Sequence, residues 1–228
     1  MKRIVHAIAV LLIHIVPLFS NGTGWLALGS GTNSSIKAMV SYQGNLIAAG
    51  TFITAGNLPA GKIASWNGTA WSPLAEGLNG DVNALAVFNN ELYAGGQFTV
   101  AGTQTVSNIA KWNGSSWSSV GTGIAGSVFS LTVFNNELVA AGNFTEAGGA
   151  PANYIAKWNG TSWLPFGSGF NAFIRAVTTH NGELIAGGFF TSSGSTSLNR
   201  IAKWNGTEWI NIGDGFNNQV YSLHSDGS

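Results

Sequence analysis

The feature that most constrains the fold is a tryptophan that returns every 46 residues along the chain. A second tryptophan, a glycine and a phenylalanine follow the same step without an insertion or a deletion. The four series are Trp25, Trp71, Trp117, Trp163 and Trp209; Trp66, Trp112, Trp158 and Trp204; Gly50, Gly96, Gly142 and Gly188; and Phe52, Phe98, Phe144 and Phe190. A strict period of this length is typical of propeller and solenoid arrays, in which each repeat is one supersecondary unit.

One repeat contains four short β-prone segments. Residues 82–88 and 91–99 are joined by a tight Asn-Asn turn, and residues 108–112 and 116–121 form a second pair. Asn113-Gly114 lies between the members of this second pair and predicts a two-residue type I′ turn, since both residue types tolerate a positive φ. No stretch shows helical periodicity. Four antiparallel strands per repeat predict an all-β protein, a β-propeller with four-stranded blades.

The paired tryptophans are predicted to form the core between blades. With a two-residue turn, Trp112 and Trp117 would lie on the same side of the blade as diagonal neighbours, close enough for their rings to touch. The alternative is a ring of exposed indoles that bind sugars. We favour core packing because every repeat has tryptophan at the same two positions. The structural set is Trp66, Trp71, Trp112, Trp117, Trp158, Trp163, Trp204 and Trp209.

The glycine pairs at the end of the second strand, Gly95-Gly96 and Gly187-Gly188, resemble those of a kelch-type repeat. An aromatic residue on the third strand and a tryptophan on the fourth extend the likeness. The sequence motif AGGQFT…IAKWNGSSW is also similar to repeats of secreted bacterial surface proteins and of fungal cortical polarity markers. The resemblance covers residues 21–228 and implies a propeller that serves as a binding scaffold or, rarely, as an enzyme such as galactose oxidase. The copper chemistry of that enzyme needs a Cys–Tyr crosslink, and this chain has no cysteine.

The first twenty residues have the plan of a secretory signal peptide. Lys2 and Arg3 form a basic start, and residues 4–16 are mostly apolar. A membrane span needs roughly 20 apolar residues, so this run is short for one. We therefore expect cleavage after residues 1–20, no membrane span afterwards, and a secreted or cell-surface protein. An uncleaved anchor is the alternative.

Composition excludes several function classes. Only 8% of residues are charged and the net charge is zero, so no cationic surface for nucleic acid is expected. The lack of cysteine excludes disulfides and thiolate metal sites. Two histidines, His180 and His224, lie outside the predicted signal peptide, and they do not occupy equivalent repeat positions. We therefore expect no metal site and no cofactor.

The two ends of the repeat region carry single strands. Residues 25–29 match a lone fourth strand, and residues 220–224 match a lone first strand after four full blades. A five-blade ring would lack two strands, and an unpaired inner strand is an aggregation-prone edge. The expectation is therefore a repeat region, residues 21–228, that is truncated at its C-terminus. The alternative is a chain that completes its ring by forming an oligomer.

The best candidate for a ligand site is a position at which the repeat is not kept. Five equivalent residues differ in size and charge, while their neighbours on both sides are small or apolar in every repeat. These are Lys37, Asn83, Phe129, Arg175 and Tyr221. In a propeller this position lies near the mouth of the central channel, where two cations with Phe and Tyr could bind an acidic sugar or a peptide carboxylate. Relaxed constraint at a solvent-facing strand end is the alternative.

The sequence predicts a secreted, kelch-like β-propeller that is a non-catalytic scaffold for a protein or glycan ligand. No catalytic residues are assigned. One alternative is an enzyme acting on polysaccharide with a loop carboxylate, Glu76, Asp81, Glu146 or Asp214, as its acid or base. The other is a structural, adhesive surface protein.

Overall fold

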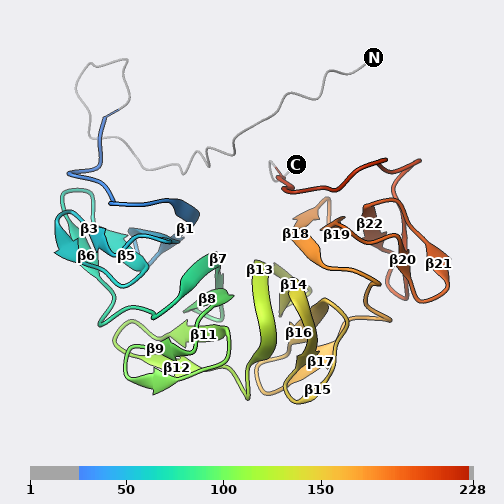
Figure 1. The fold of residues 1–228 in the computed structure, drawn as a ribbon, viewed down its shortest axis with the longest axis horizontal. Coiled ribbons are helices and arrows are strands. Elements are labelled where there is room, and N and C mark those ends of the chain that lie inside the picture. Colours follow the sequence, from blue (N-terminus) through green and yellow to red (C-terminus); the bar gives the residue numbers. More distant parts are fainter. Residues whose placement is uncertain (1–25, 226–228) are drawn as a thin grey trace.

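A computed structural model of the chain describes residues 26–225, and the predicted signal peptide, residues 1–20, lies outside them. Four β-sheet blades follow one another in an open arc around a common axis (Figure 1). Every regular element in the described part of the chain is a β-strand, which confirms the predicted all-β propeller. Residues 26–225 therefore contain no helix with the length and hydrophobicity needed to cross a bilayer.

Each blade contains four antiparallel strands in one sheet, and the first of them lies closest to the central axis (Figure 1); in the third blade a short fifth strand joins the sheet. Blade 1 consists of β1 (Ile36–Tyr42), β2 (Asn45–Gly50), β5 (Ile63–Trp66) and β6 (Trp71–Pro73). Blade 2 consists of β7 (Asp81–Phe88), β8 (Glu91–Gln97), β11 (Ile109–Trp112) and β12 (Trp117–Ser119). Blade 3 consists of β13 (Ile124–Phe134), β14 (Glu137–Ala147), β16 (Ile155–Trp158) and β17 (Trp163–Pro165). Blade 4 consists of β18 (Ile174–His180), β19 (Glu183–Gly188), β22 (Ile201–Trp204) and β23 (Trp209–Asn211).

The connection between the second and third strand of each blade folds into a short hairpin that the sequence did not reveal. Its strands are only two residues long, so they carry no detectable alternation of polar and apolar residues. In blade 3 the long strand β14 itself forms one arm of this hairpin. The short strands are β3 (Thr54–Ala55) with β4 (Leu58–Pro59), β9 (Val100–Ala101) with β10 (Gln104–Thr105), β15 (Ala150–Pro151) with β14, and β20 (Ser192–Ser193) with β21 (Thr196–Ser197).

The predicted type I′ turn at Asn113-Gly114 is wrong. Trp112 pairs directly with Trp117, so the connection is a four-residue loop. The Asn113 side chain explains the longer loop, because its Oδ1 accepts the backbone N–H groups of Ser115 and Ser116, each at 2.9 Å. The two tryptophans are consequently direct cross-strand partners and not diagonal ones.

The two-residue turns with positive φ lie instead between the first and second strands. Asn89 and Asn90 have φ values of 48° and 61°, and Phe88 pairs with Glu91 across them. These angles are those of a type I′ turn, whose twist matches that of the flanking strands. This turn fixes the register of the inner hairpin in each blade.

The segments expected as lone strands at the two ends are not strands in the described residues. Residues 26–29 and 220–224 have no ladder partner, because the described chain supplies no second strand beside either of them. Val220 nevertheless follows the course of an inner strand. Its N–H donates to the Gly188 carbonyl at 3.2 Å, and its Cγ1 packs over Gly187.

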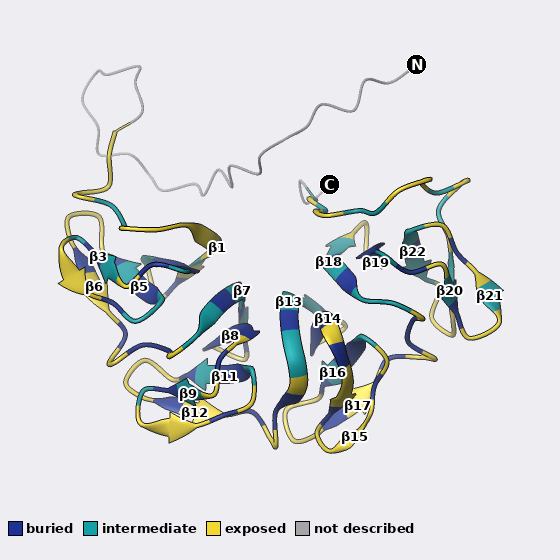
Figure 2. Cartoon of the chain, in the orientation of Figure 1, coloured by how far each residue is buried: buried dark blue, intermediate teal, exposed yellow. Residues whose placement is uncertain are grey.

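The apolar core lies between neighbouring blades, and the inner face of blade 1 is left open. Val82, Val128 and Ile174 are fully buried against the preceding blade. Their equivalent in blade 1, Ile36, is 40% exposed, and much of β1 is coloured as exposed in Figure 2. The described residues therefore leave uncovered, in blade 1 alone, the inner surface that the other blades bury.

A buried tyrosine in this core gives stability a pH dependence. Tyr93, on β8, is 2% exposed, and its hydroxyl donates to Glu91 Oε2 at 3.4 Å. Burial, with the Glu91 charge, raises the pKa of Tyr93 to about 12 from its ordinary 10.0. Between these two values the unfolded tyrosine ionises while the folded one stays neutral. Stability from this group is therefore present below pH 10 and is lost as pH rises toward 12.

We expect the free energy of unfolding to fall by about 1 kcal/mol per pH unit in this window because of Tyr93. Urea unfolding of the wild type and of Tyr93→Phe between pH 9 and pH 12 measures the effect. The variant should have the shallower slope, because it lacks the group that ionises on unfolding. Equal slopes for the two proteins would contradict the assignment.

Candidate ligand site at the mouth of the central channel

Each inner strand has a β-bulge at the position that varies between repeats. At this position the pairing of the first strand with the second skips one residue in every blade. A bulge leaves the extra residue unpaired and re-aims its side chain. The skipped residues are Lys37, Asn83, Phe129 and Arg175. The backbone therefore presents the same four positions that the sequence singles out.

The repeated glycine on the second strand makes this bulge possible. A Cβ atom at Gly96 would lie 2.0 Å from the carbonyl oxygen of Asp81, which is closer than any real contact. The same 2.0 Å approach is found at Gly50 and Gly142, and 2.6 Å at Gly188. Only a residue without a side chain allows the inner strand to come this close. The glycine series is thus a requirement of the site's backbone.

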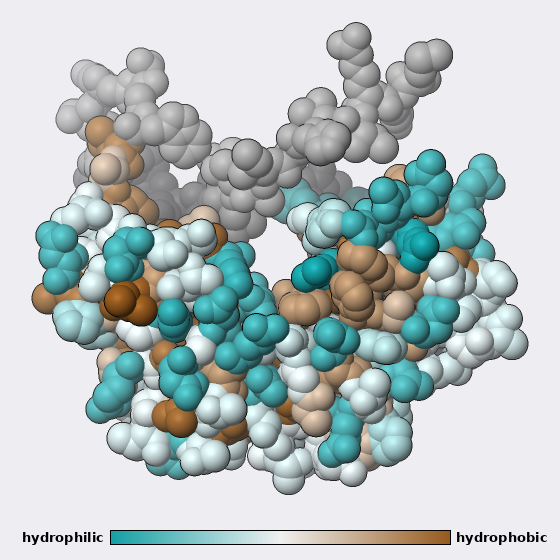
Figure 3. All heavy atoms as spheres, in the orientation of Figure 1, coloured by the Kyte–Doolittle hydropathy of each residue, from teal (hydrophilic) through white to brown (hydrophobic). Residues whose placement is uncertain are grey.

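All five variable residues line one hollow at the mouth of the channel. The hollow has a volume of about 540 Å³, and its lining consists of Lys37, Asn83, Gln97, Phe129, Arg175 and Tyr221. In the space-filling view, hydrophilic side chains of the first two blades face hydrophobic ones of the last two across the central opening (Figure 3). The structure thus brings the sequence-predicted residues together in a site with a polar half and an apolar half.

The polar half is a connected set of side chains. Lys37 Nζ lies 3.1 Å from a carboxylate oxygen of Asp81 and donates to Asn83 Oδ1 at 3.0 Å. Asn83 in turn donates from Nδ2 to the Val128 carbonyl at 2.9 Å. The charge of Lys37 is therefore compensated within the site, and both ends of the Asn83 amide already have partners.

The apolar half is built around the guanidinium of Arg175. Its Cζ lies 4.6 Å from the ring centre of Phe129 and 5.1 Å from that of Phe173. The rings of Phe189 and Tyr221 follow at 5.6 Å and 5.9 Å. Phe173 and Phe189 also stack on each other, with ring centres 4.1 Å apart. Cation–π attraction to these four rings holds the guanidinium in place.

In the part of the chain that the structure describes, no acceptor satisfies the Arg175 guanidinium. Its Nε is buried without a hydrogen-bond partner, and among residues 26–225 no carboxylate forms an ion pair with it. A buried polar donor without a partner is unfavourable and rare in native proteins. The mouth therefore carries one uncompensated positive charge at Arg175.

Two aromatic residues of the site, Phe173 and Phe189, were missed by sequence reasoning. They lie next to the bulge, one directly before Ile174 and the other directly after Gly188. The sequence did contain a signal for them, since the residues at both positions also differ from repeat to repeat. The equivalents of Phe173 are Ser35, Asp81, Ser127 and Gln219, and those of Phe189 are Thr51, Gln97 and Asn143. The variable part of the repeat thus includes the residues on both sides of the bulge.

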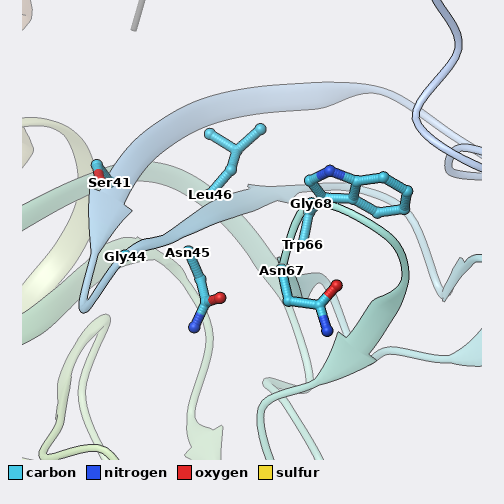
Figure 4. Close-up of a pocket in the computed structure, with 7 residues that line it drawn as sticks. All are labelled: Ser41, Gly44, Asn45, Leu46, Trp66, Asn67 and Gly68. Carbon is cyan, nitrogen blue, oxygen red and sulfur yellow. The ribbon is translucent and has the colours of Figure 1, made fainter. Parts of the chain in front are cut away.

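A second hollow, of about 110 Å³, lies on blade 1 (Figure 4). It is lined by Ser41, Gly44, Asn45, Leu46, Trp66, Asn67 and Gly68. At the equivalent place on blade 2, the hydroxyl of Tyr42 from blade 1 donates toward the carbonyls of Asn90 and Trp112, at 3.3 and 3.5 Å. The hollow is therefore a contact surface between blades that stays open on blade 1 in the described part of the chain.

The tryptophan pairs lie between blades. Trp112 and Trp117 have ring centres 5.3 Å apart, and Trp117 Nε1 donates to the Leu74 carbonyl of the preceding blade at 3.1 Å. The same bond recurs from Trp71, Trp163 and Trp209, each to a carbonyl 43 residues earlier. Trp204 is half-buried, and the other seven tryptophans of the structural set are buried. In these positions the indoles link one blade to the next.

The carboxylates weighed for catalysis are not brought together. Asp81 lies at the mouth, on β7, where Lys37 neutralises it. Glu146 lies on β14, and Glu76 and Asp214 lie in loops after β6 and β23. Among the described residues, no three or more His, Asp or Glu side chains gather in a way that could hold a metal ion.

Comparisons with solved structures agree on the fold. The computationally designed Ika8 protein matches with a TM-score of 0.51 at 16% identity, over 86% of this chain and 67% of that one. The designed Ika4 protein matches with 0.50 at 16% identity, over 79% and 98%. The WD40 beta propeller domain of Doa1 matches with 0.52 at 14% identity; the match covers 83% of this chain but only 58% of the Doa1 chain. At these identities the likeness shows a β-propeller fold alone.

Sequence comparisons identify the family. A search of curated proteins gives no match. The profile of the Rax2 C-terminal beta propeller domain matches residues 25–178, which is more than half of the chain and includes the first three blades. The likeness to kelch-type repeats stays a prediction. Because the matched profile spans more than half of the chain, the chain belongs to the Rax2 C-terminal beta propeller domain family.

Proposed function

We propose that this protein is a non-catalytic binding scaffold that holds a protein partner at the mouth of its central channel. The chain is a β-propeller by family and by fold, and β-propeller domains generally act as scaffolds for protein interactions, which supports the proposal. The repeated core explains how the blades hold together. The function is carried by the positions that differ between repeats.

One observation carries the proposal. The five residues at one variable position of the repeat line a single hollow, although they come from four blades and the C-terminal segment. Relaxed constraint at five separate strand ends would not produce a connected polar network on one side and an aromatic cluster on the other. A rigid scaffold with variable side chains on one face is the usual basis of recognition by a repeat fold.

A protein partner fits the mouth better than a glycan. A sugar presents many hydroxyl groups, and each needs a hydrogen-bond partner when it is buried. The polar side chains of the mouth are already engaged with one another: Gln97 donates to Ser127 Oγ at 2.6 Å, and the Tyr221 hydroxyl accepts from Gln219. The groups that remain are aromatic surfaces and one cation, which are typical of protein interfaces.

The partner is proposed to be extracytoplasmic. The sequence of residues 1–20, with a basic start and an apolar run, supports export of the chain. The partner should therefore be sought in culture medium and in cell-surface extracts of the source organism, with cytosol as the comparison.

Removing two aromatic side chains from the mouth should abolish partner capture. We expect the double variant Phe129→Ala/Tyr221→Ala to capture at least about tenfold less partner from surface extracts than the wild type does. The reason is that aromatic residues dominate interface energetics. Capture on immobilised protein, quantified by mass spectrometry, measures this. Tyr221 is 62% exposed, so its loss should leave the fold intact.

A matched control removes two exposed apolar side chains elsewhere. Leu58 on β4 and Leu164 on β17 are 48% and 39% exposed and do not line the mouth. The double variant Leu58→Ala/Leu164→Ala should capture the partner as the wild type does. Equal losses in both double variants, or no enriched extracytoplasmic protein on the wild type, would contradict the proposed function.

A further inference from the structure

The Arg175 guanidinium has the properties of a binding group that lacks its ligand. It has five N–H donors, and no hydrogen bond or ion pair to them is found in the described residues. Four aromatic rings surround it, and their faces supply cation–π attraction but no hydrogen bond to its N–H groups. A charged group in such surroundings is best stabilised by a hydrogen-bonded anion.

The charge balance of the mouth selects an anion with a single charge. Lys37 is neutralised by Asp81, so Arg175 supplies the only net charge among the residues that line the hollow. A second negative charge on the ligand would find no further uncompensated cation among these residues. A phosphate group carries close to two charges at neutral pH and fits this balance poorly.

The surroundings of the guanidinium also select a planar anion. Because Nε is buried, a ligand in the hollow would meet the edge formed by the two Nη atoms. A carboxylate can accept two parallel hydrogen bonds from this edge, which is the strongest geometry for such a pair. The rings that flank the guanidinium would keep water from the bond.

The residues that line the hollow determine which kind of side chain can lie next to the bound carboxylate. Phe129 and Tyr221 line the hollow beside Arg175 and belong to its ring cluster. An apolar or aromatic side chain next to the carboxylate would pack on these rings. A group with several hydroxyls would find both ends of the Asn83 amide and the Nε2 group of Gln97 already engaged.

We infer that Arg175 binds the carboxylate of a peptide segment whose neighbouring side chain is apolar and packs on Phe129 and Tyr221. This inference rests on the proposed function, since it names the chemistry of the partner at the same mouth. The carboxylate can be a chain terminus or an Asp or Glu side chain, and the two sources are separated below.

The test uses the arginine Nε–Hε resonances of the isotope-labelled protein. The chain has only three arginines, Arg3, Arg175 and Arg200, and the spectrum of Arg175→Lys assigns the Arg175 signal. The probes are N-acetyl-glycyl-phenylalanine, with a free terminal carboxylate, and its C-terminal amide. N-acetyl-glutamyl-phenylalanine amide offers the carboxylate on a side chain instead. Galacturonate and phenylphosphonate represent an acidic sugar and a dianion.

We expect at least one of the two peptide acids to shift the Arg175 signal in a saturable way, and the amide to leave it unchanged. Arg175→Gln should weaken binding of that probe at least about tenfold, because the ion-paired hydrogen bonds are lost. Arg175→Lys should restore part of the affinity, because it keeps the charge without the fork geometry. Lys111→Gln, which removes a cation paired with Glu91 away from the mouth, should bind as the wild type does.

Several results would overturn the inference. These are equal binding of acid and amide, tighter binding of galacturonate or phenylphosphonate than of either peptide acid, or unchanged affinity in Arg175→Gln. The inference about the carboxylate can be refuted without refuting the proposed function. If no peptide acid binds while Phe129→Ala/Tyr221→Ala still loses its partner, the mouth remains the interaction site and only the carboxylate chemistry is wrong.

Discussion

Replacing Trp117 with alanine is expected to lower the free energy of unfolding by about 3–5 kcal/mol. The indole is 4% exposed, packs on Trp112 and donates its N–H to the Leu74 carbonyl of the preceding blade. The substitution leaves a cavity between two blades and an unsatisfied carbonyl. Because the same bond recurs at the other blade boundaries, the effect should be comparable at Trp163. Urea unfolding followed by circular dichroism measures it.

Two further variants separate packing from hydrogen bonding. Trp117→Phe keeps most of the ring and removes the N–H donor, so its loss should be smaller than that of the alanine variant. Ser118→Ala changes an exposed residue on the same strand and should stay within about 0.5 kcal/mol of the wild type. A loss below about 1 kcal/mol in Trp117→Ala would show that this indole does not hold the blades together.

The second large effect is expected at the glycine opposite the bulge. Gly96→Ala places a Cβ 2.0 Å from the Asp81 carbonyl oxygen, so the inner strand of blade 2 has to move. Strain of this kind costs about 1–3 kcal/mol and occasionally more. The movement also displaces Asp81 and Asn83, which hold Lys37 in the polar half of the mouth. We therefore expect a lower unfolding midpoint together with weaker binding at the mouth.

The neighbouring glycine is the matched control. A Cβ at Gly95 would meet a side-chain methyl of Val128 at 2.5 Å and no backbone atom among its nearest contacts. The equivalent positions of blades 1 and 3 are Ala49 and Ala141, both fully buried. Gly95→Ala should therefore cost clearly less than Gly96→Ala. The reverse order would contradict the account of the bulge.

The blade architecture could be predicted because the period made each assignment repeat several times. An isolated run such as residues 91–97 is ambiguous, but four copies at one spacing, each bounded by Asn or Gly turns, leave little choice. The two-residue strands of the small hairpins could not be predicted. They are too short for alternation and are held by tertiary contacts around the indoles, such as that of Gly56 with Trp71.

The turn error has a clear physical origin. Asn-Gly is a strong hairpin signal, but a following Ser or Thr lets the asparagine side chain cap a longer loop. Asn113 accepts from the hydroxyl of Ser115 at 2.9 Å as well as from two backbone N–H groups. The same pattern recurs at Asn67, Asn159 and Asn205. Two extra loop residues, Ser115 and Ser116, both after the Asn-Gly pair, then changed the expected diagonal tryptophan contact into a direct one.

That the five variable residues come together could be predicted, whereas the electrostatics of their hollow could not. The departure from the repeat at Lys37 and Arg175 indicated two free cations. The structure leaves only one, because Asp81 lies 46 residues after Ser35 in the repeat and reaches Lys37 from the next blade. The cluster around Arg175 likewise depends on Phe173 and Phe189, whose side chains meet only after the bulge has turned the inner strand.

We expect the bulge residues to form the binding site and the repeated residues to form only its support. Asn83 shows that the bulge position accepts asparagine. The triple variant Lys37→Asn/Phe129→Asn/Arg175→Asn therefore has asparagine at the bulge position of all four blades. The decisive measurement is the dissociation constant of this variant for the captured partner, relative to the wild type. We expect a rise of at least about a hundredfold with the blades still folded, since several central contacts are lost together. An unchanged constant would place the interaction elsewhere on the propeller.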